Sequence, residues 1–170
     1  LRNSNFGVVG LGSIGGRVAE LAAGFGANVS YWSRHQKDVP FTYKELRTLL
    51  SESDYISLNV AQAPETEKLL NEETLALVKS GAVIINTVPP EVVDTDALAA
   101  RLAKGDIFYI SDHGDEMPEE ELAKIKGYDN CLLLPAIGFI TQEARINKQE
   151  IFVKNMEAFI SGEPQNNVSQ

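Results

Sequence analysis

Cysteine and long apolar runs are both scarce in this sequence. Cys131 is the only cysteine among 170 residues, so the chain has no intramolecular disulfide and no cysteines paired at zinc-ligand spacing. The longest apolar stretch, residues 131–140, is too short to span a membrane and contains Pro135 and Gly138. The first five residues lack the apolar core of a signal peptide. We therefore expect a cytoplasmic protein with no membrane partner.

Basic residues are also few. Fifteen Lys and Arg stand against 24 Asp and Glu, which gives a net charge of −9 and a sequence pI of about 4.7. A nucleic-acid interface needs a basic face that neutralises phosphates, so nucleic acid is excluded as a partner. With 170 residues and 44% hydrophobic side chains, the chain is long enough and apolar enough to form one globular domain.

Short β-branched runs alternate with longer amphipathic runs along the chain. This alternation predicts an α/β fold, a parallel sheet covered by helices on both faces in three layers. Strands are expected at residues 6–9, 28–32, 55–58, 82–86, 107–111 and 132–134. Helices are expected near residues 14–25, 43–50, 71–78, 94–104, 119–125 and 141–160. We expect one domain over residues 1–162, including the last helix, followed by a polar tail at 163–170.

A glycine-rich segment follows the first expected strand and opens the first expected helix. It reads Gly10-Leu11-Gly12-Ser13-Ile14-Gly15. Gly10 suits a tight turn, Gly12 a close approach to a pyrophosphate, and Gly15 close packing of helix against strand. The backbone N–H groups of Ser13 and Ile14 would then face the anion at the helix N-terminus. The alternative is a turn whose three glycines serve packing alone.

The end of the second expected strand bears on which dinucleotide binds. An acidic residue there would accept hydrogen bonds from the adenosine ribose, but the sequence continues Ser33-Arg34-His35 with no acid. Ser33, Arg34, Lys37 and His35 are candidates to contact a 2′-phosphate, which favours NADP over NAD as the cofactor. The alternative is a solvated basic turn that discriminates poorly between the two.

Several separated segments carry a family resemblance beyond the glycines. They are residues 8–15, 53–58, 64–66, 79–87, 93–94 with 97–98, and 135–138 with 141–144. On these segments, residues 1–144 resemble the coenzyme-binding domain of the D-isomer-specific 2-hydroxyacid dehydrogenases, which include glyoxylate and hydroxypyruvate reductases. The resemblance implies a Rossmann-like doubly wound sheet. It also implies a separate substrate domain, which we expect to be absent from these 170 residues.

The resemblance further implies hydride transfer between nicotinamide and a small 2-hydroxy or 2-oxo acid. Its members use an Arg to hold the substrate carboxylate, a His as general acid and base, and a Glu that supports the His. The Arg position corresponds to Pro89, and the His position to Ala136. Glu116 lies one residue from the expected Glu position, with Asp115 as an alternative.

The same resemblance implies, by contrast, that the cofactor contacts are retained. Asp112 matches the strand-end Asp that contacts the nicotinamide carboxamide, and Thr87 and Val88 match the backbone that passes the nicotinamide ring. His113 follows Asp112 at the end of an expected strand, so it is a candidate replacement for the missing His, oriented by one of the nearby carboxylates. The alternatives are a structural role for His113 and, less favoured, a metal site in the same acidic loop, so we expect no metal.

Three functions follow as hypotheses. The first is the coenzyme domain of a divergent NADP-dependent oxidoreductase, inactive without its substrate domain. The second is a catalytically silent module that senses NAD(P)H, which the replacement of the Arg and His favours. The third is a dehydrogenase for a substrate without a carboxylate. The resemblance also implies a homodimer, for which Phe108, Tyr109 and Phe139 are candidate contacts unless they belong to the core.

Overall fold

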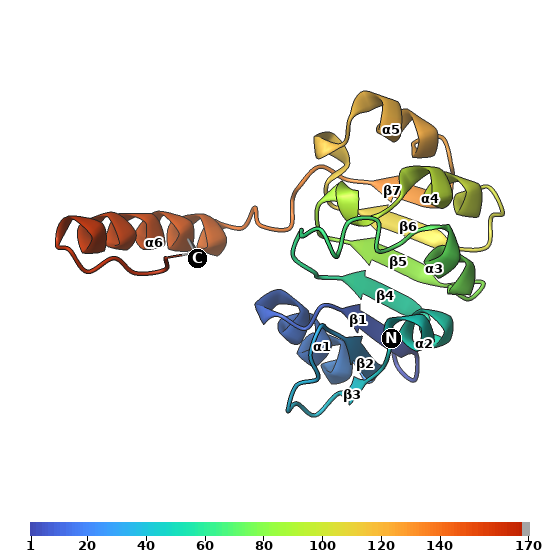
Figure 1. Cartoon of the computed structure of the whole chain (residues 1–170), viewed down its shortest axis with the longest axis horizontal. Helices are drawn as coiled ribbons and strands as arrows, with labels where there is room; N and C mark the ends of the chain where they lie inside the picture. Colours follow the sequence, from blue (N-terminus) through green and yellow to red (C-terminus); the bar gives the residue numbers. More distant parts are fainter. Residues whose placement is uncertain (168–170) are drawn as a thin grey trace. The chain divides into compact units, whose positions relative to one another are not determined.

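A parallel sheet forms the centre of the molecule's larger unit (Figure 1). The computed structural model describes residues 1–167, and its contacts divide the chain into two units, Leu1–Ala136 and residues from 137 onward. The strands are β1 (Asn5–Val9), β2 (Asn28–Trp32), β3 (Thr42–Tyr43), β4 (Tyr55–Leu58), β5 (Val83–Asn86), β6 (Phe108–Ser111) and β7 (Cys131–Leu133). All pair in parallel in the order β3-β2-β1-β4-β5-β6-β7, which confirms the predicted doubly wound α/β fold.

The helices follow the predicted alternation with the strands. They are α1 (Ser13–Gly24), α2 (Leu46–Glu52), α3 (Glu72–Leu77), α4 (Thr95–Leu102), α5 (Glu119–Ile125) and α6 (Gln142–Ile160). Two short 3-10 helices lie at Pro90–Val92 and Gly114–Glu116. Side-chain caps fix where several helices begin. The Asp94 carboxylate, for example, accepts from the Asp96 and Ala97 N–H groups and caps α4.

One predicted helix was wrong at its start. The sequence predicts a helix over residues 43–50, but Thr42 and Tyr43 form β3, and α2 begins only at Leu46. The Tyr43 ring packs edge-on against Tyr31 of β2 at a centroid distance of 5.6 Å. Pairing with β2 therefore overrides the local helical pattern, and two residues are too few to give a strand signal of their own.

Opposite faces of the sheet carry different helices. Phe6 and Val8 of β1 pack with Ala19 and Ala22 of α1 in one apolar cluster. The opposite face is covered by α2, α3, α4 and α5, which lie side by side and form a second, larger cluster with the central strands. These two clusters make the three layers that the sequence predicts.

The α1 face is not covered equally along the sheet. Residues paired across neighbouring parallel strands point to the same face of the sheet. The pairs run from Val8 on β1 to Leu132 on β7, by way of Ser57, Ile85 and Ile110. Leu132 therefore lies on the same face as α1, but at the β7 edge of the sheet. Leu132 is 51% exposed. Phe108, two residues before Ile110 on β6, lies on the same face and is also 51% exposed. Tyr109 points to the other face and is buried in the core, so this candidate dimer contact is a core residue.

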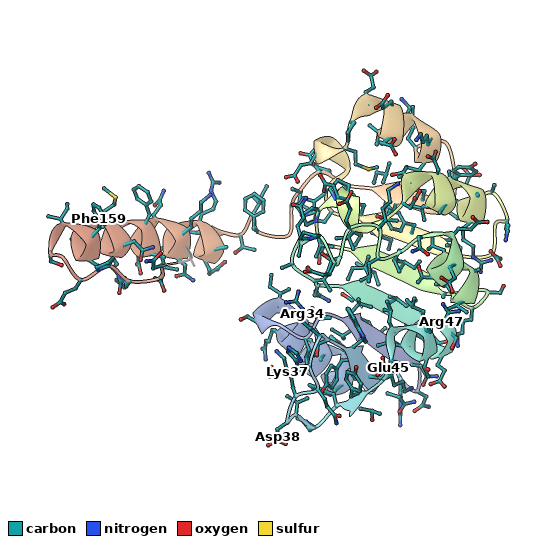
Figure 2. The ribbon with its side chains drawn as sticks, viewed as in Figure 1. Arg34, Lys37, Asp38, Glu45, Arg47 and Phe159 are labelled. Atoms are coloured by element: carbon teal, nitrogen blue, oxygen red, sulfur yellow. The ribbon has the colours of Figure 1, made fainter. Side chains whose placement is uncertain are left out.

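The second unit consists of one long helix with its flanking segments. The Thr141 hydroxyl accepts from the Ala144 N–H and caps α6, which has no buried residue over its 19 positions. Its exposed large apolar side chains are Ile146, Ile151, Phe152, Val153, Met156, Phe159 and Ile160 (Phe159 is labelled in Figure 2). Phe139, another candidate dimer contact, is also exposed.

The boundaries of the predicted domain stay a prediction. The single domain over residues 1–162 joins the sheet and α6, which the contacts assign to separate units. Residues 168–170 of the predicted tail lie outside the described residues. Among residues 1–167, no helix combines the length and the apolar character needed to cross a bilayer.

Candidate functional site

The loop between β1 and α1 requires glycine at two of its positions. Gly10 has φ +95°, and a Cβ there would lie 2.7 Å from the backbone of Asn59. A Cβ on Gly15 would lie 1.9 Å from the Gly10 carbonyl oxygen, so only glycine lets α1 approach β1 this closely. Gly12 differs, because a Cβ there would point into open space. The loop is therefore built for a close turn and leaves room above Gly12.

Backbone N–H groups at the start of α1 lie next to Gly12 in the chain. The first bond of the helical ladder runs from the Gly16 N–H to the Gly12 carbonyl. The N–H groups of Ser13 and Ile14 come before that bond, and both residues are exposed. Together with the helix dipole, they form the arrangement that binds a phosphate group at a helix N-terminus.

A cleft of about 930 Å³ opens beside the glycine loop. It lies at the carboxyl ends of β1, β2 and β4, where the strand order reverses direction around β1. Its lining residues come from the glycine loop, the loop after β2 and the loop after β4: Gly10, Leu11, Gly12, Trp32, Ser33, Arg34, His35, Lys37, Asn59, Val60, Ala61, Ala63, Glu65, Thr66 and Leu69. The structure thus brings the glycine segment and the basic segment of the sequence into one cleft.

Hydrogen bonds to backbone groups shape the basic loop after β2. The buried Tyr31 hydroxyl donates to the Lys37 carbonyl at 3.0 Å and accepts from the Lys37 N–H at 2.8 Å. The Ser33 hydroxyl donates to the His35 carbonyl at 2.6 Å, and the Lys37 ammonium donates to the Leu11 carbonyl of the glycine loop. Figure 2 shows Arg34 and Lys37 near one another on this loop. Ser33 and Lys37 therefore hold the loop's shape, while Arg34 extends to a different partner.

That partner is a carboxylate from another part of the chain. The Arg34 guanidinium lies 3.6 Å from the Glu65 carboxylate, and both side chains are more than two-thirds exposed. The sequence shows no acid at the end of β2, yet the fold brings Glu65 from the loop after β4 to the same place. Sequence reasoning missed Glu65 because its distance from Arg34 is set by the pairing of β1 with β4.

Asn59 is a further cleft residue outside the sequence prediction. The Asn59 amide nitrogen donates to the Ser57 carbonyl and hydroxyl, whereas its buried Oδ1 has no hydrogen-bond partner among the described residues. An unpartnered buried acceptor beside a glycine loop is a feature that a bound donor would satisfy. Asn59 follows directly after β4, the neighbour of β1, and that position was the signal available in the sequence.

The residues expected near a nicotinamide lie on a separate set of loops. The Thr87 hydroxyl donates to the Leu58 carbonyl at 3.1 Å, and the Val88 N–H donates to the Asn86 side chain at 3.0 Å. Neither residue lines the 930 Å³ cleft. Pro89 follows them and has neither a charged group nor an N–H, so it cannot hold a carboxylate.

The loop after β6 brings a histidine and a carboxylate together. His113 Nδ1 lies 2.9 Å from Glu116 Oε2, with 20% of the histidine side chain exposed. Asp115, the alternative to Glu116, instead accepts from the Ala136 N–H at 3.0 Å. The Asp112 N–H donates to the Asn86 carbonyl, which ties this loop to the end of β5. In this pair the carboxylate oxygen of Glu116 accepts and His113 Nδ1 donates, in the neutral Nδ1–H tautomer as in the protonated ring.

The site residues fit a dinucleotide better than a metal. Open space above Gly12, N–H groups at the start of α1, and a cleft with Arg34 at its far side suit a pyrophosphate and an adenosine phosphate. Within residues 1–167, no three His, Cys, Asp or Glu side chains lie close enough to hold a metal ion.

Comparison with known proteins identifies the family to which the chain is similar. The family described as "D-isomer specific 2-hydroxyacid dehydrogenase, NAD binding domain" matches residues 1–138. The glyoxylate reductase of Thermococcus litoralis is 41% identical over 174 residues, covering 96% of this chain and 51% of that protein. The glyoxylate reductase of Pyrococcus horikoshii is 40% identical, covering 92% of this chain and 48% of its own length.

Solved structures also resemble the chain. D-lactate dehydrogenase from Aquifex aeolicus, in complex with NAD and lactic acid, superposes with a TM-score of 0.85 at 30% identity, covering 94% of this chain and 54% of that one. An acyclic imino acid reductase in complex with NADPH and D-Arg has a TM-score of 0.89 at 29% identity, covering 99% of this chain and 54% of its own. The chain spans about half the length of the relatives it matches.

Proposed function

The chain belongs to the D-isomer specific 2-hydroxyacid dehydrogenase family, as its NAD binding domain, and from that membership we propose a more specific role. We propose that it is the coenzyme domain of an oxidoreductase that transfers a hydride between NADP(H) and a small 2-hydroxy or 2-oxo acid. The observation that carries the proposal is the cleft that the glycine loop shares with the loop of Arg34 and Lys37.

The preference for NADP rests on the charge at the adenosine end of this cleft. Arg34 is exposed at the cleft and pairs only loosely, at 3.6 Å, with Glu65. A 2′-phosphate with about two negative charges would compete well for this guanidinium, because bidentate Arg–phosphate pairs are strong. Among the similar structures, one holds NADPH and another NAD, so both cofactors occur in this fold. NAD would bind the same cleft more weakly.

A titration of the chain with each cofactor tests this preference. Trp32 is the only tryptophan and lines the cleft, so its fluorescence reports binding there. We expect a lower dissociation constant for NADPH than for NADH. Tighter binding of NADH would overturn the NADP preference, and no binding of either would overturn the cofactor role.

His113 is the residue we propose as the proton donor. When bound, the nicotinamide supplies the hydride to the substrate carbon that bears the oxygen. Because His113 Nδ1 faces Glu116, Nε2 is the atom that would hold the proton for that oxygen, and the Glu116 carboxylate would stabilise the protonated ring. Pro89 offers no carboxylate contact, so the substrate carboxylate would be held by the substrate domain.

The test needs a longer protein that contains the substrate domain, since we propose no turnover by residues 1–170 alone. Replacing His113 with Ala should lower kcat by about 10²–10⁴, the range for losing a general acid. Glu116→Gln keeps the shape but removes the charge and should shift the pH profile of kcat/KM. Unchanged turnover in His113→Ala would eliminate the proton-donor role.

A silent NAD(P)H-sensing module is the second candidate. Pro89 and Ala136 stand where the family resemblance expects the Arg and the His, which favours loss of catalysis with retention of cofactor binding. NADPH oxidation by the longer protein over a panel of 2-oxo acids and aldehydes separates the two. Tight NADPH binding without oxidation of any substrate would favour the sensor.

Partners are proposed from two exposed apolar regions. Phe108 and Leu132 lie half-exposed on the sheet, and α6 carries exposed apolar side chains along its length. Exposed apolar surfaces of this kind mark sites where further polypeptide packs. We propose that the substrate domain and a second copy of the chain, in a cytoplasmic homodimer, cover these two surfaces. Sedimentation analysis should find a dimer, and a strictly monomeric longer protein would contradict this assignment.

A further inference from the structure

A buried polar pair joins β5 and β6 below the nicotinamide-side loops. The Asn86 amide nitrogen donates to the Tyr109 hydroxyl at 3.0 Å. Asn86 is 1% exposed and Tyr109 is 3% exposed. Two polar side chains buried this deeply in an apolar cluster require partners, so their bonds constrain both orientations.

The Asn86 end of this pair holds the loop after β5. The Asn86 side-chain oxygen accepts from the Val88 N–H at 3.0 Å. Because the amide is planar, fixing its nitrogen on Tyr109 also fixes the direction of its oxygen. The backbone at Val88 is thereby held through Asn86 to the tyrosine hydroxyl.

The other end of the network holds the loop after β6. The Ser111 side chain lies near Tyr109 and contributes to lowering the pKa of that tyrosine, and its hydroxyl accepts from the His113 N–H at 3.3 Å. Tyr109 and Ser111 are two residues apart on β6, and Ser111 pairs with Asn86, so all three side chains lie on one face of the sheet. Tyr109 therefore lies between Asn86, which holds Val88 on one loop, and Ser111, which holds His113 on the next.

The buried environment keeps this hydroxyl protonated. Desolvation raises the pKa of Tyr109 to about 12, while its bonds with Asn86 and Ser111 lower it in part. The phenol is neutral over the whole physiological range, so it can donate one hydrogen bond and accept another at every working pH.

We propose that the Tyr109 hydroxyl is a positioning group that couples the Val88 and His113 loops, so that they move as one unit. The role at the nicotinamide end rests on the proposed function, but the coupling itself does not. A pure packing role would need only the ring, which phenylalanine also supplies.

The matched control is the second buried tyrosine with a loop-holding hydroxyl. The Tyr31 hydroxyl on β2 bonds the Lys37 N–H and carbonyl, as described above, and Lys37 lines the cleft. Tyr31→Phe and Tyr109→Phe thus remove the same atom from the same kind of site, each beside a different loop.

Residue-resolved amide hydrogen exchange on the isotope-labelled chain tests the coupling. In Tyr109→Phe, we expect exchange at both Val88 and His113 to accelerate about threefold to tenfold, the equivalent of one net hydrogen bond, with Lys37 unchanged. In Tyr31→Phe, Lys37 should accelerate while Val88 and His113 stay as in wild type. Acceleration at only one of the two coupled amides, or at neither, overturns the proposal.

A second variant keeps the test decisive if Tyr109→Phe fails to fold. Ser111→Ala removes the acceptor of the His113 N–H and a polar neighbour of Tyr109. Coupling predicts faster exchange at Val88 as well, although Ser111 makes no contact with that amide in the hydrogen-bond network described. Acceleration confined to His113 would overturn the proposal.

Binding distinguishes failure of this inference from failure of the proposed function. Tyr109→Phe should weaken NADPH binding severalfold but leave 2′,5′-ADP, which lacks the nicotinamide half, bound as in wild type. General structural damage would weaken both ligands and so count against positioning. If the wild-type chain binds neither ligand, the proposed function fails, while the exchange pattern still decides the coupling.

Discussion

The carboxyl edge of the sheet divides into two regions that differ in how a ligand would be held. At β1 and β2, backbone groups and a cleft of about 930 Å³ form the site, and Gly15 leaves no space even for a Cβ. At β5 and β6, side chains form the proposed site: His113 and Glu116 pair on the loop after β6, and Pro89 lies on the loop after β5. Backbone sites tolerate few substitutions, whereas side-chain sites change with a single residue.

This difference explains how cofactor binding and catalysis can diverge separately in one fold. The proposed anion site above Gly12 depends on the close turn at Gly10 and Gly15 and on a helix N-terminus, both of which are part of the fold itself. The proposed chemistry needs particular side chains at strand ends, which the fold does not require for its stability. Each prediction below alters one residue and compares it with a matched variant or a second measurement.

The largest effect is expected at Gly15. In Gly15→Ala the methyl group meets the Gly10 carbonyl oxygen at 1.9 Å, so α1 must move away from β1. We expect a loss of about 1–3 kcal/mol in the free energy of unfolding and a fall in NADPH affinity of more than tenfold. Denaturant unfolding and fluorescence titration measure both.

Gly16→Ala is the control for this substitution. A Cβ on Gly16 meets nothing within 4 Å and sits inside α1, so alanine should stabilise the chain by about 0.5–1 kcal/mol. If Gly15→Ala behaved like Gly16→Ala, the close approach of helix and strand would not be what the glycine provides.

Much of the β1–β2 region was predictable from the sequence, and much of the β5–β6 region was not. The glycine loop has a local signature, because its spacing alone encodes the turn. Glu65 meets Arg34 only through strand pairing, and Tyr109 meets Asn86 only through the register of β5 with β6. Contacts of this kind depend on residues 23 or more positions apart, and no local pattern records them. The short β3 was missed because its two residues give no strand signal of their own and form a strand only by pairing with β2.

A moderate effect is expected at Arg34. Arg34→Gln removes the charge facing a 2′-phosphate and should weaken NADPH binding about tenfold while leaving NADH binding nearly unchanged. The opposite variant, Glu65→Gln, removes the competing carboxylate and should tighten NADPH binding about twofold to threefold, the scale of an exposed ion pair. Calorimetric titration measures both, and equal losses for NADPH and NADH in Arg34→Gln would contradict the assignment.

No effect on the cofactor, and a modest one on stability, is expected at Asp94, which caps α4. Hydrogen bonding from Lys68, followed by the Ala97 N–H, lowers the pKa of Asp94 below its ordinary value. A carboxyl whose folded-state pKa is depressed stabilises the fold above its unfolded pKa of about 3.9, and this stability is lost as pH falls through the folded pKa. Asp94→Ala should cost about 1 kcal/mol at neutral pH through loss of the cap.

Thermal unfolding at a series of pH values measures this contribution. The difference in Tm between wild type and Asp94→Ala should shrink on acidification below about pH 4. NADPH affinity at neutral pH should be the same in both proteins, because Asp94 lies outside the cleft. A Tm difference that grows on acidification would contradict the sign of this pKa shift.

The most direct test of the central claim is a map of backbone amide chemical shifts in the labelled chain with NADPH and then with NADH. Binding to the β1–β2 region predicts shifts at Gly12, Ser13 and Ile14 with both cofactors. Differences between the two cofactors should concentrate at residues 33–37, beside the proposed 2′-phosphate. Shifts that leave the glycine loop unchanged, or cofactor differences that lie away from residues 33–37, would contradict it.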